Sequence, residues 1–277
     1  SELFEPEQAM SEFGVGKNMV RAMRYWALAT NFFTITKEGN VRATELGNLI
    51  LGDSAKGNGF GWDPYFENPA TLWLAHWEIA TNEHLCTAWD FAFSTFNRTI
   101  FTKQSLVSGL ISEVEEKEWS VSLGSIEKDI SCILHMYCPD PKTPKGAFRE
   151  EGLESPLAEL GLIWADAASG GYRFEVGPKL SLDPRVLYYS IAQYAEQRES
   201  KLLSLDEIFY SHGAPGRVFK LDENSMCSLL EMAASETSGA LEWQETGPLR
   251  QLKISEDLKN PLGLLRDIYA KSEEIAA

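Results

Sequence analysis

The sequence is poor in cysteine and has no hydrophobic run long enough to cross a membrane. Its four cysteines, Cys86, Cys132, Cys138 and Cys227, are not spaced like the framework of a disulfide-rich protein. We therefore expect reduced thiols and a cytoplasmic protein. No signal peptide is recognisable at the start of the chain, and no membrane partner is expected.

Positive charge is also scarce. The chain has 25 Lys and Arg against 41 Asp and Glu, a net charge of -16. Such an acidic protein is not expected to coat nucleic acid without specificity. The first 60 residues are different, because their six Lys and Arg nearly balance seven Asp and Glu. A local DNA-binding face, if there is one, is expected in this front part of the chain.

The remaining composition is that of a globular protein. The chain has 277 residues, of which 44% are hydrophobic and 11% aromatic, enough for two or three domains. We expect a mainly α fold with small β-hairpin wings. The predicted domains are an N-terminal winged helix-turn-helix over residues 1–56, a central helical domain over 57–147, and a winged-helix-like C-terminal region over 148–277.

A Gly-Val-Gly-Lys stretch near the start raises the question of a nucleotide-binding loop. A phosphate loop needs a preceding buried strand, an earlier glycine, and a Ser or Thr after the lysine. Here Ser11 stands in place of the first glycine and Asn18 in place of the hydroxyl residue, and the preceding residues favour a helix. The pattern therefore argues against a nucleotide loop.

The same stretch fits a helix-turn-helix. A short helix is expected to end at Gly14, because glycine readily takes the left-handed conformation that ends helices. A second helix is predicted from Lys17 to about Asn31, followed by a strand, a turn at residues 38–40, a second strand and a helix from Glu45. This is the order of a winged helix, which offers its second helix to a DNA major groove.

Helical periodicity separates the side chains of this second helix. Met19, Ala22, Met23, Trp26 and Thr30 fall on one side, and Lys17, Arg21 and Arg24 on the other, with Asn18 and Tyr25 beside them. The cations are predicted to track phosphates, while Asn18 and Tyr25 reach base edges, and Arg42 in the second strand is a further DNA contact. Two alternatives are an ordinary solvated helix face and a module that binds protein.

Later segments repeat this order without the cations. The helix predicted from Thr71 is apolar nearly all round and therefore buried. Residues 155–179 read as a helix followed by a hairpin, and residues 204–254 as two helices followed by a hairpin. We interpret both segments as scaffold or partner-binding surface.

Candidate chemistry is concentrated just before and within the buried helix. Asp63, Glu67 and His76 follow a glycine-rich stretch at residues 52–61. Asp63 and Glu67 are predicted to hold Mg²⁺ or Mn²⁺, with His76 activating water at a phosphodiester. The structural alternative is that the carboxylates bind backbone amides and that His76 is a core histidine. Cysteines at positions 132 and 138, flanking a histidine, are interpreted as buried thiols, not zinc ligands.

Two stretches together resemble the SspB-like family of bacterial proteins. These are FGVGKNMVRAMRYW at residues 13–26 and GWDPYFENPATLWLAHWEIA at residues 61–80. The resemblance is dense over about residues 4–97 and general beyond them. A His-Glu-Thr-Phe type stretch of the family would lie upstream of the first residue.

The resemblance implies a role in DNA phosphorothioation and defence against phage. In such systems one component nicks a DNA strand so that sulfur can replace a phosphate oxygen, and its partners include a cysteine desulfurase and a sulfurtransferase-like protein. Double-stranded DNA and the other Ssp components are therefore the expected partners, and a homo-oligomer is left open. The alternative is a non-catalytic adaptor that recruits the sulfur-transfer enzymes to DNA.

Overall fold

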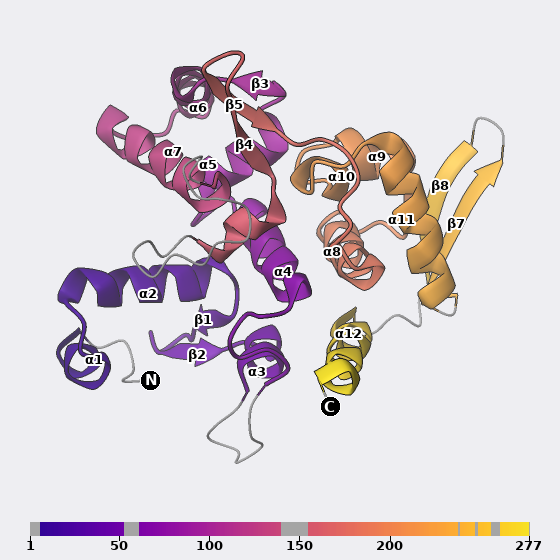
Figure 1. Cartoon of the computed structure of the whole chain (residues 1–277), viewed down its shortest axis with the longest axis horizontal. Helices are drawn as coiled ribbons and strands as arrows, with labels where there is room; N and C mark the ends of the chain where they lie inside the picture. The colour runs from indigo at the N-terminus through magenta and orange to yellow at the C-terminus, as the bar shows by residue number, and fades with distance from the viewer. Residues whose placement is uncertain are drawn as a thin grey trace.

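The computed structural model shows a mainly helical protein with small antiparallel sheets (Figure 1). It describes residues 6–52, 61–139, 155–237, 239–246, 249–255 and 261–276. The predicted mainly α class with small β elements is confirmed. Within the described residues, no helix is both long and apolar enough to span a membrane.

The N-terminal elements follow the predicted order. They are α1 (Pro6–Phe13), α2 (Lys17–Ala29), β1 (Phe33–Ile35), β2 (Val41–Ala43) and α3 (Glu45–Leu51). Gly14, with φ of 64°, provides the left-handed turn after α1. The strands form an antiparallel hairpin in which Thr34 lies opposite Arg42. Thr44 begins α3 by accepting a hydrogen bond from the backbone N–H of Gly47.

The predicted apolar helix forms the centre of the molecule. It is α4 (Pro69–Ala80), and Figure 1 shows it between the N-terminal elements and two further groups. All its residues from Ala70 to Ala80 are buried, which explains why its sequence is apolar nearly all round. It is followed by α5 (Thr87–Asp90), which continues directly into a π-helix, η3 (Phe91–Thr95).

A second group combines two helices and a three-stranded sheet. Its elements are β3 (Ile100–Phe101), α6 (Lys103–Glu116), α7 (Leu123–Tyr137), the 3-10 helix η4 (Pro156–Leu160), β4 (Ile163–Asp166) and β5 (Gly171–Phe174). The strand order is β3-β5-β4, with every pair antiparallel. Thr102 caps α6 by accepting from the N–H of Ser105.

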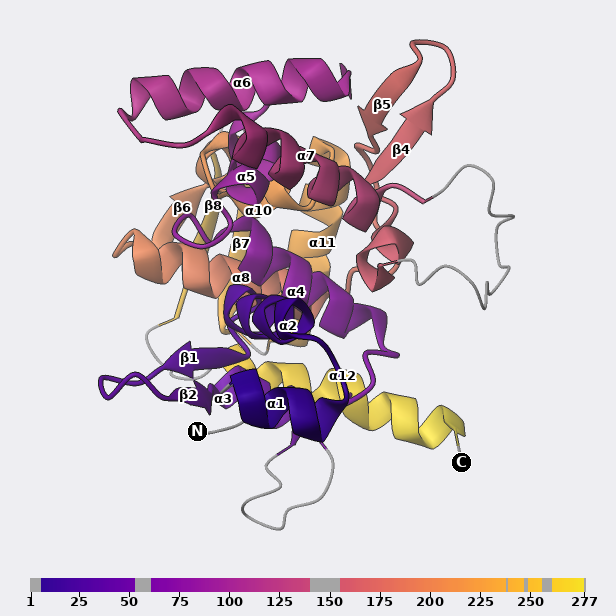
Figure 2. The ribbon, with the colours of Figure 1, turned by 90° about the vertical axis from the view of Figure 1, so that its left-hand side faces the viewer.

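The third group repeats this topology. Its elements are α8 (Pro184–Gln197), β6 (Leu202–Ser204), α9 (Leu205–Tyr210), α10 (Pro215–Val218), α11 (Glu223–Glu236), β7 (Leu241–Thr246) and β8 (Leu249–Ile254), followed by α12 (Pro261–Ala276). The strand order β6-β8-β7 again pairs the first strand with the last. Figure 2 shows these sheets in different parts of the molecule, with the N-terminal elements gathered at one end.

One predicted domain boundary crosses a sheet. β3 lies in the predicted central domain and β5 in the predicted C-terminal region, yet the two strands pair at Ile100 with Arg173 and at Phe101 with Tyr172. Backbone hydrogen bonds therefore join residues on both sides of position 148. The division into three domains stays a prediction.

Candidate functional site

The first half of α2 is largely exposed, apart from the buried Val20, and carries predicted cations. Lys17, Asn18 and Arg21 are exposed, and Arg24 is half-buried. Periodicity places Met19 and Met23 on the same side of the helix as Trp26. Both are nevertheless accessible to solvent, since Met19 is 55% exposed and Met23 is 37% exposed. The second half of α2 is packed against the protein instead.

The start of α2 leaves its backbone donors without a side-chain cap. Gly16 is the N-cap residue and makes no side-chain cap hydrogen bond, and no acidic residue lies in the first turn. Uncapped N–H groups and the positive end of the helix dipole together attract anions. The exposed side chain of Lys17 lies at the same end of the helix. This helix end is therefore suited to a phosphate group.

The cations of the N-terminal unit have no carboxylate partners among the described residues. No acidic residue occurs in the sequence between Glu12 and Glu38, and Lys37 and Arg42 on the hairpin are exposed. Elsewhere in the described residues, five cations do pair with carboxylates, namely Lys117, Arg173, Arg185, Arg250 and Lys253. An unpaired cation keeps its full charge available for a phosphate.

The Tyr25 hydroxyl makes contacts within the protein, and its predicted contact with base edges stays a prediction. The hydroxyl donates a 2.7 Å hydrogen bond to the carbonyl of Leu85 and lies 3.6 Å from the sulfur of Cys86. Burial raises the pKa of Tyr25 far above its usual value. The next residue, Trp26, packs edge-on against Trp89. Tyr25 and Trp26 therefore hold the second half of α2 on the segment that follows α4.

Asp63 acts as a backbone acceptor. Its Oδ1 accepts from the N–H of Glu67 at 2.8 Å, and its Oδ2 accepts from the N–H of Asn68 at 3.0 Å. Asp63 is 6% exposed, whereas the side chain of Glu67 is exposed. These contacts fit the structural alternative, in which Asp63 shapes the turn before α4. Most of the glycine-rich stretch, residues 53–60, lies outside the described residues.

His76 lies fully inside the core. Its Nε2 is 3.0 Å from the carbonyl oxygen of Val218, and its Nδ1 is 2.9 Å from the hydroxyl of Tyr137. Because a carbonyl only accepts, Nε2 carries the proton and Nδ1 accepts from Tyr137. Burial, followed by the charges of Lys220 and Lys179, lowers the pKa of His76 to about 3.

The three predicted catalytic residues do not gather into a ligand set. Within the described residues, the one group of His, Cys, Asp and Glu side chains close enough to share a metal is Glu83, Asp90 and His212. The geometry favours structural roles for Asp63 and His76, and their catalytic assignment stays a prediction.

The cluster of Glu83, Asp90 and His212, called the acidic cluster below, was missed from the sequence. His212 Nε2 lies 3.0 Å from Asp90 Oδ2, although the two residues are 122 positions apart. Two residues so far apart in the sequence cannot be recognised as partners from their spacing. The local feature of Asp90 is its position at the junction between α5 and η3. Short π-helices frequently occur at functional sites.

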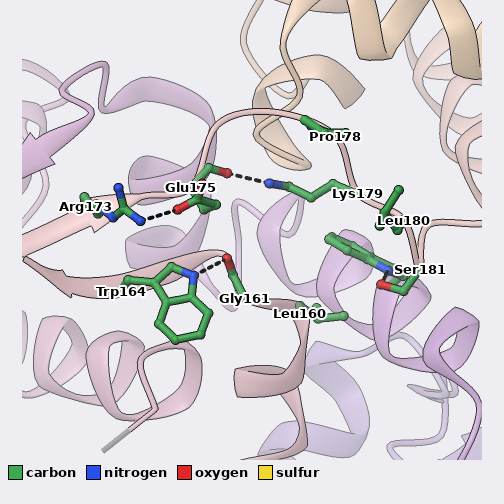
Figure 3. Close-up of a pocket in the computed structure, with 10 residues that line it drawn as sticks. Leu160, Gly161, Trp164, Arg173, Glu175, Pro178, Lys179, Leu180 and Ser181 are labelled. Carbon is green, nitrogen blue, oxygen red and sulfur yellow. Dashed lines mark hydrogen bonds and ion pairs between the residues drawn. The ribbon is translucent and has the colours of Figure 1, made fainter. Parts of the chain in front are cut away.

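A hollow of about 520 Å³ opens between the β4–β5 hairpin and residues 178–181 (Figure 3). Its polar groups bond to one another. Arg173 pairs with Glu175 at 2.9 Å, Lys179 donates to the Glu175 carbonyl, and the Trp164 indole N–H donates to the Gly161 carbonyl. Because these donors are already used, the hollow offers few polar groups to a ligand.

Comparisons with known proteins place the chain in a family. Residues 1–269 match the family described as Protein of unknown function (DUF4007). The chain belongs to the DUF4007 family. A comparison with curated proteins found no match.

Two solved structures support the SspB-like resemblance. The DUF4007 chain is similar to the structure titled "SspB crystal structure", with 30% identity, and to "Magnesium ion-bound SspB crystal structure", with 29% identity. Each comparison has a TM-score of 0.81 and covers 97% of this chain and 80% of the other. The expected SspB-like family is thereby confirmed.

Proposed function

We propose that this protein is a double-stranded DNA-binding component of an Ssp-type DNA phosphorothioation system and that α2 is its recognition helix. The similarity to SspB over nearly the whole chain supports the system. The observation that supports DNA binding is the exposed first half of α2, where Lys17 and Arg21 make no ion pair with any carboxylate of the described residues.

The contacts that we propose are of two kinds: phosphate contacts, which position the protein on DNA, and base contacts, which recognise the sequence. Lys17 and Arg21 bind phosphates, and a further phosphate sits at the uncapped start of α2. Asn18, exposed between them, is suited to a base edge because its amide both donates and accepts. Arg42 and Lys37 on the hairpin supply the contacts of a wing.

The rest of the protein restricts DNA to this end. The chain as a whole carries a net charge of -16, so most of its surface repels a polyanion. The exposed side of α11, in the repeated topology, carries Glu231 and Met232 instead of cations. We therefore assign DNA contact to the N-terminal unit and leave the acidic groups for protein partners.

The experiment is a fluorescence-anisotropy titration of duplex DNA with the Lys17→Gln/Arg21→Gln double variant. Each lost phosphate contact reduces the slope of log K against log salt by about 0.9, so we expect a reduction of about 1.8. At 0.1 M salt this corresponds to binding weaker by roughly 60-fold.

The matched control is Lys103→Gln/Lys128→Gln, which removes the same charge from exposed positions on α6 and α7. Equal losses in the two double variants would mean that net charge alone governs binding. An unchanged affinity in the α2 variant would place the DNA site elsewhere.

Strand nicking is the finer part of the proposal, and it is supported by the family resemblance. The test is incubation of supercoiled plasmid with the protein, with and without Mg²⁺ or Mn²⁺, and measurement of open circles. Glu67→Gln tests the predicted catalytic group at an exposed position, where a change in folding is not expected. Plasmid that stays closed while duplex binding is intact would favour the non-catalytic adaptor.

A further inference from the structure

The acidic cluster joins two distant parts of the chain. Glu83 follows α4, Asp90 ends α5 where the π-helix begins, and His212 lies between α9 and α10. His212 Nδ1 is 3.7 Å from Glu83 Oε1, and the three donor atoms lie within 4.8 Å of one another. His212 thus lies between the two carboxylates, with Nδ1 facing Glu83 and Nε2 facing Asp90, and the three residues come from separate elements.

Asp90 carries a carboxylate oxygen to which no described residue donates a hydrogen bond. The residue is 4% exposed, and its Oδ1 is buried without a hydrogen-bond partner, while Oδ2 faces His212. A buried carboxylate oxygen without a hydrogen-bond partner costs free energy, and such atoms are rare in native structures. An ion pair with His212 accounts for Oδ2 and leaves Oδ1 unexplained.

The neighbouring cation does not fill this role. Lys117 is close enough to influence the pKa of His212, but its amine is 2.8 Å from Glu113 Oε1 and lies over the Trp119 ring. The other two cluster members remain open to solvent, with the His212 side chain 42% exposed and the Glu83 side chain 56% exposed. The site is thus buried at one ligand and accessible at two.

We propose that Glu83, Asp90 and His212 form a site for a divalent metal cation. Two carboxylates and an imidazole are a mixed oxygen and nitrogen set, which suits Mn²⁺ or Zn²⁺ better than Ca²⁺, since Ca²⁺ takes oxygen ligands. The inference does not depend on DNA binding or nicking, because it rests on the three side chains alone.

The position of the site ties it to α2. The N–H of Asp90 donates to the carbonyl of Cys86, and Tyr25 of α2 donates to the carbonyl of the preceding Leu85. A cation bound here lies on the segment that supports the proposed recognition helix. Its charge offsets those of the Glu83 and Asp90 carboxylates.

The test is isothermal titration of metal-free protein with Mn²⁺ alone. We expect a saturable site with one ion per chain, and binding weaker by at least 10-fold in both Asp90→Asn and His212→Gln. Ca²⁺ is expected to bind at least 10-fold more weakly than Mn²⁺. Because the His212 side chain is partly exposed, we expect His212→Gln to fold. Thermal melting of the variant is measured in parallel to confirm this.

Two further variants make the result specific. Asp166→Asn, at a half-buried carboxylate on the β4–β5 hairpin, should leave Mn²⁺ affinity unchanged. Glu67→Gln should also leave it unchanged, which separates this cluster from the site predicted near Asp63. The proposal is overturned by absence of a saturable site, by undiminished affinity in folded His212→Gln, or by loss of binding in Glu67→Gln. A failure of the α2 variants to alter DNA binding leaves this result unaffected.

Discussion

The burial of His76 predicts how stability should depend on pH. The imidazole has a pKa of about 3 in the folded protein, against an ordinary value of 6.5. The unfolded chain therefore binds a proton at a higher pH than the folded chain does. The free energy of unfolding has its full value from His76 above pH 6.5 and loses it as the pH falls from 6.5 towards 3.

The size of the effect follows from the two pKa values. Each pH unit within this range costs about 1.4 kcal/mol, so the loss at pH 5 is about 2 kcal/mol. That is a substantial part of the 5–15 kcal/mol or so by which domains are stable. The structural cause is that Nδ1 accepts from Tyr137 and is enclosed by the rings of Phe93 and Trp73.

The assay is urea unfolding at pH 7 and pH 5 for the wild type and His76→Gln. We expect the variant to be less stable at pH 7 but to lose about 2 kcal/mol less than the wild type between the two pH values. Burial raises the pKa of Glu78, which acts in the opposite direction, but this contribution is common to both proteins and cancels in the comparison.

His84→Gln provides the control, because His84 is exposed and its replacement should leave the pH dependence unchanged. Equal losses in the wild type and His76→Gln would refute the reasoning, since His76 would then take up its proton in the folded state at ordinary cost.

Three other changes test the fold. Gly14→Ala places a Cβ at φ of 64° and should destabilise the end of α1 by about 1 kcal/mol in thermal unfolding, and no loss would contradict the left-handed turn. Thr102→Ala removes the cap of α6 and should cost about 1 kcal/mol, whereas Thr102→Ser should cost less than half of that. Tyr189→Phe removes the 2.7 Å hydrogen bond to buried Glu78 and should cost about 1–3 kcal/mol, compared with less than about 0.5 kcal/mol for exposed Tyr210→Phe. Similar losses for the two tyrosine variants would mean that the Glu78 bond adds nothing.

Elements that depend on residues close by in the sequence were predictable from the sequence. The turn at Gly14, the start of α2 at Lys17 and the cap at Thr102 depend on neighbouring residues, because backbone conformation and capping act within one turn. The burial of α4 followed from its apolar composition on every side. The family resemblance rested on two such stretches and was confirmed.

Elements that depend on residues far away in the sequence were decided by the tertiary structure. β3 has two residues and β6 has three, too few for a periodic pattern, and each exists because a later hairpin offers a paired edge. Periodicity placed Met19 and Met23 on an apolar side but does not tell whether another element covers that side.

The candidate chemistry shows the same limit. Sequence proximity brought Asp63, Glu67 and His76 together as a hypothesis, but folding gave His76 partners 61 and 142 positions away. The acidic cluster joins Asp90 to His212 across 122 positions. The sequence by itself determined the helices and the cationic start of α2, since those depend on short-range forces. Which carboxylates and imidazoles meet was settled only by how the helices pack, because burial and charge act through space and not along the chain.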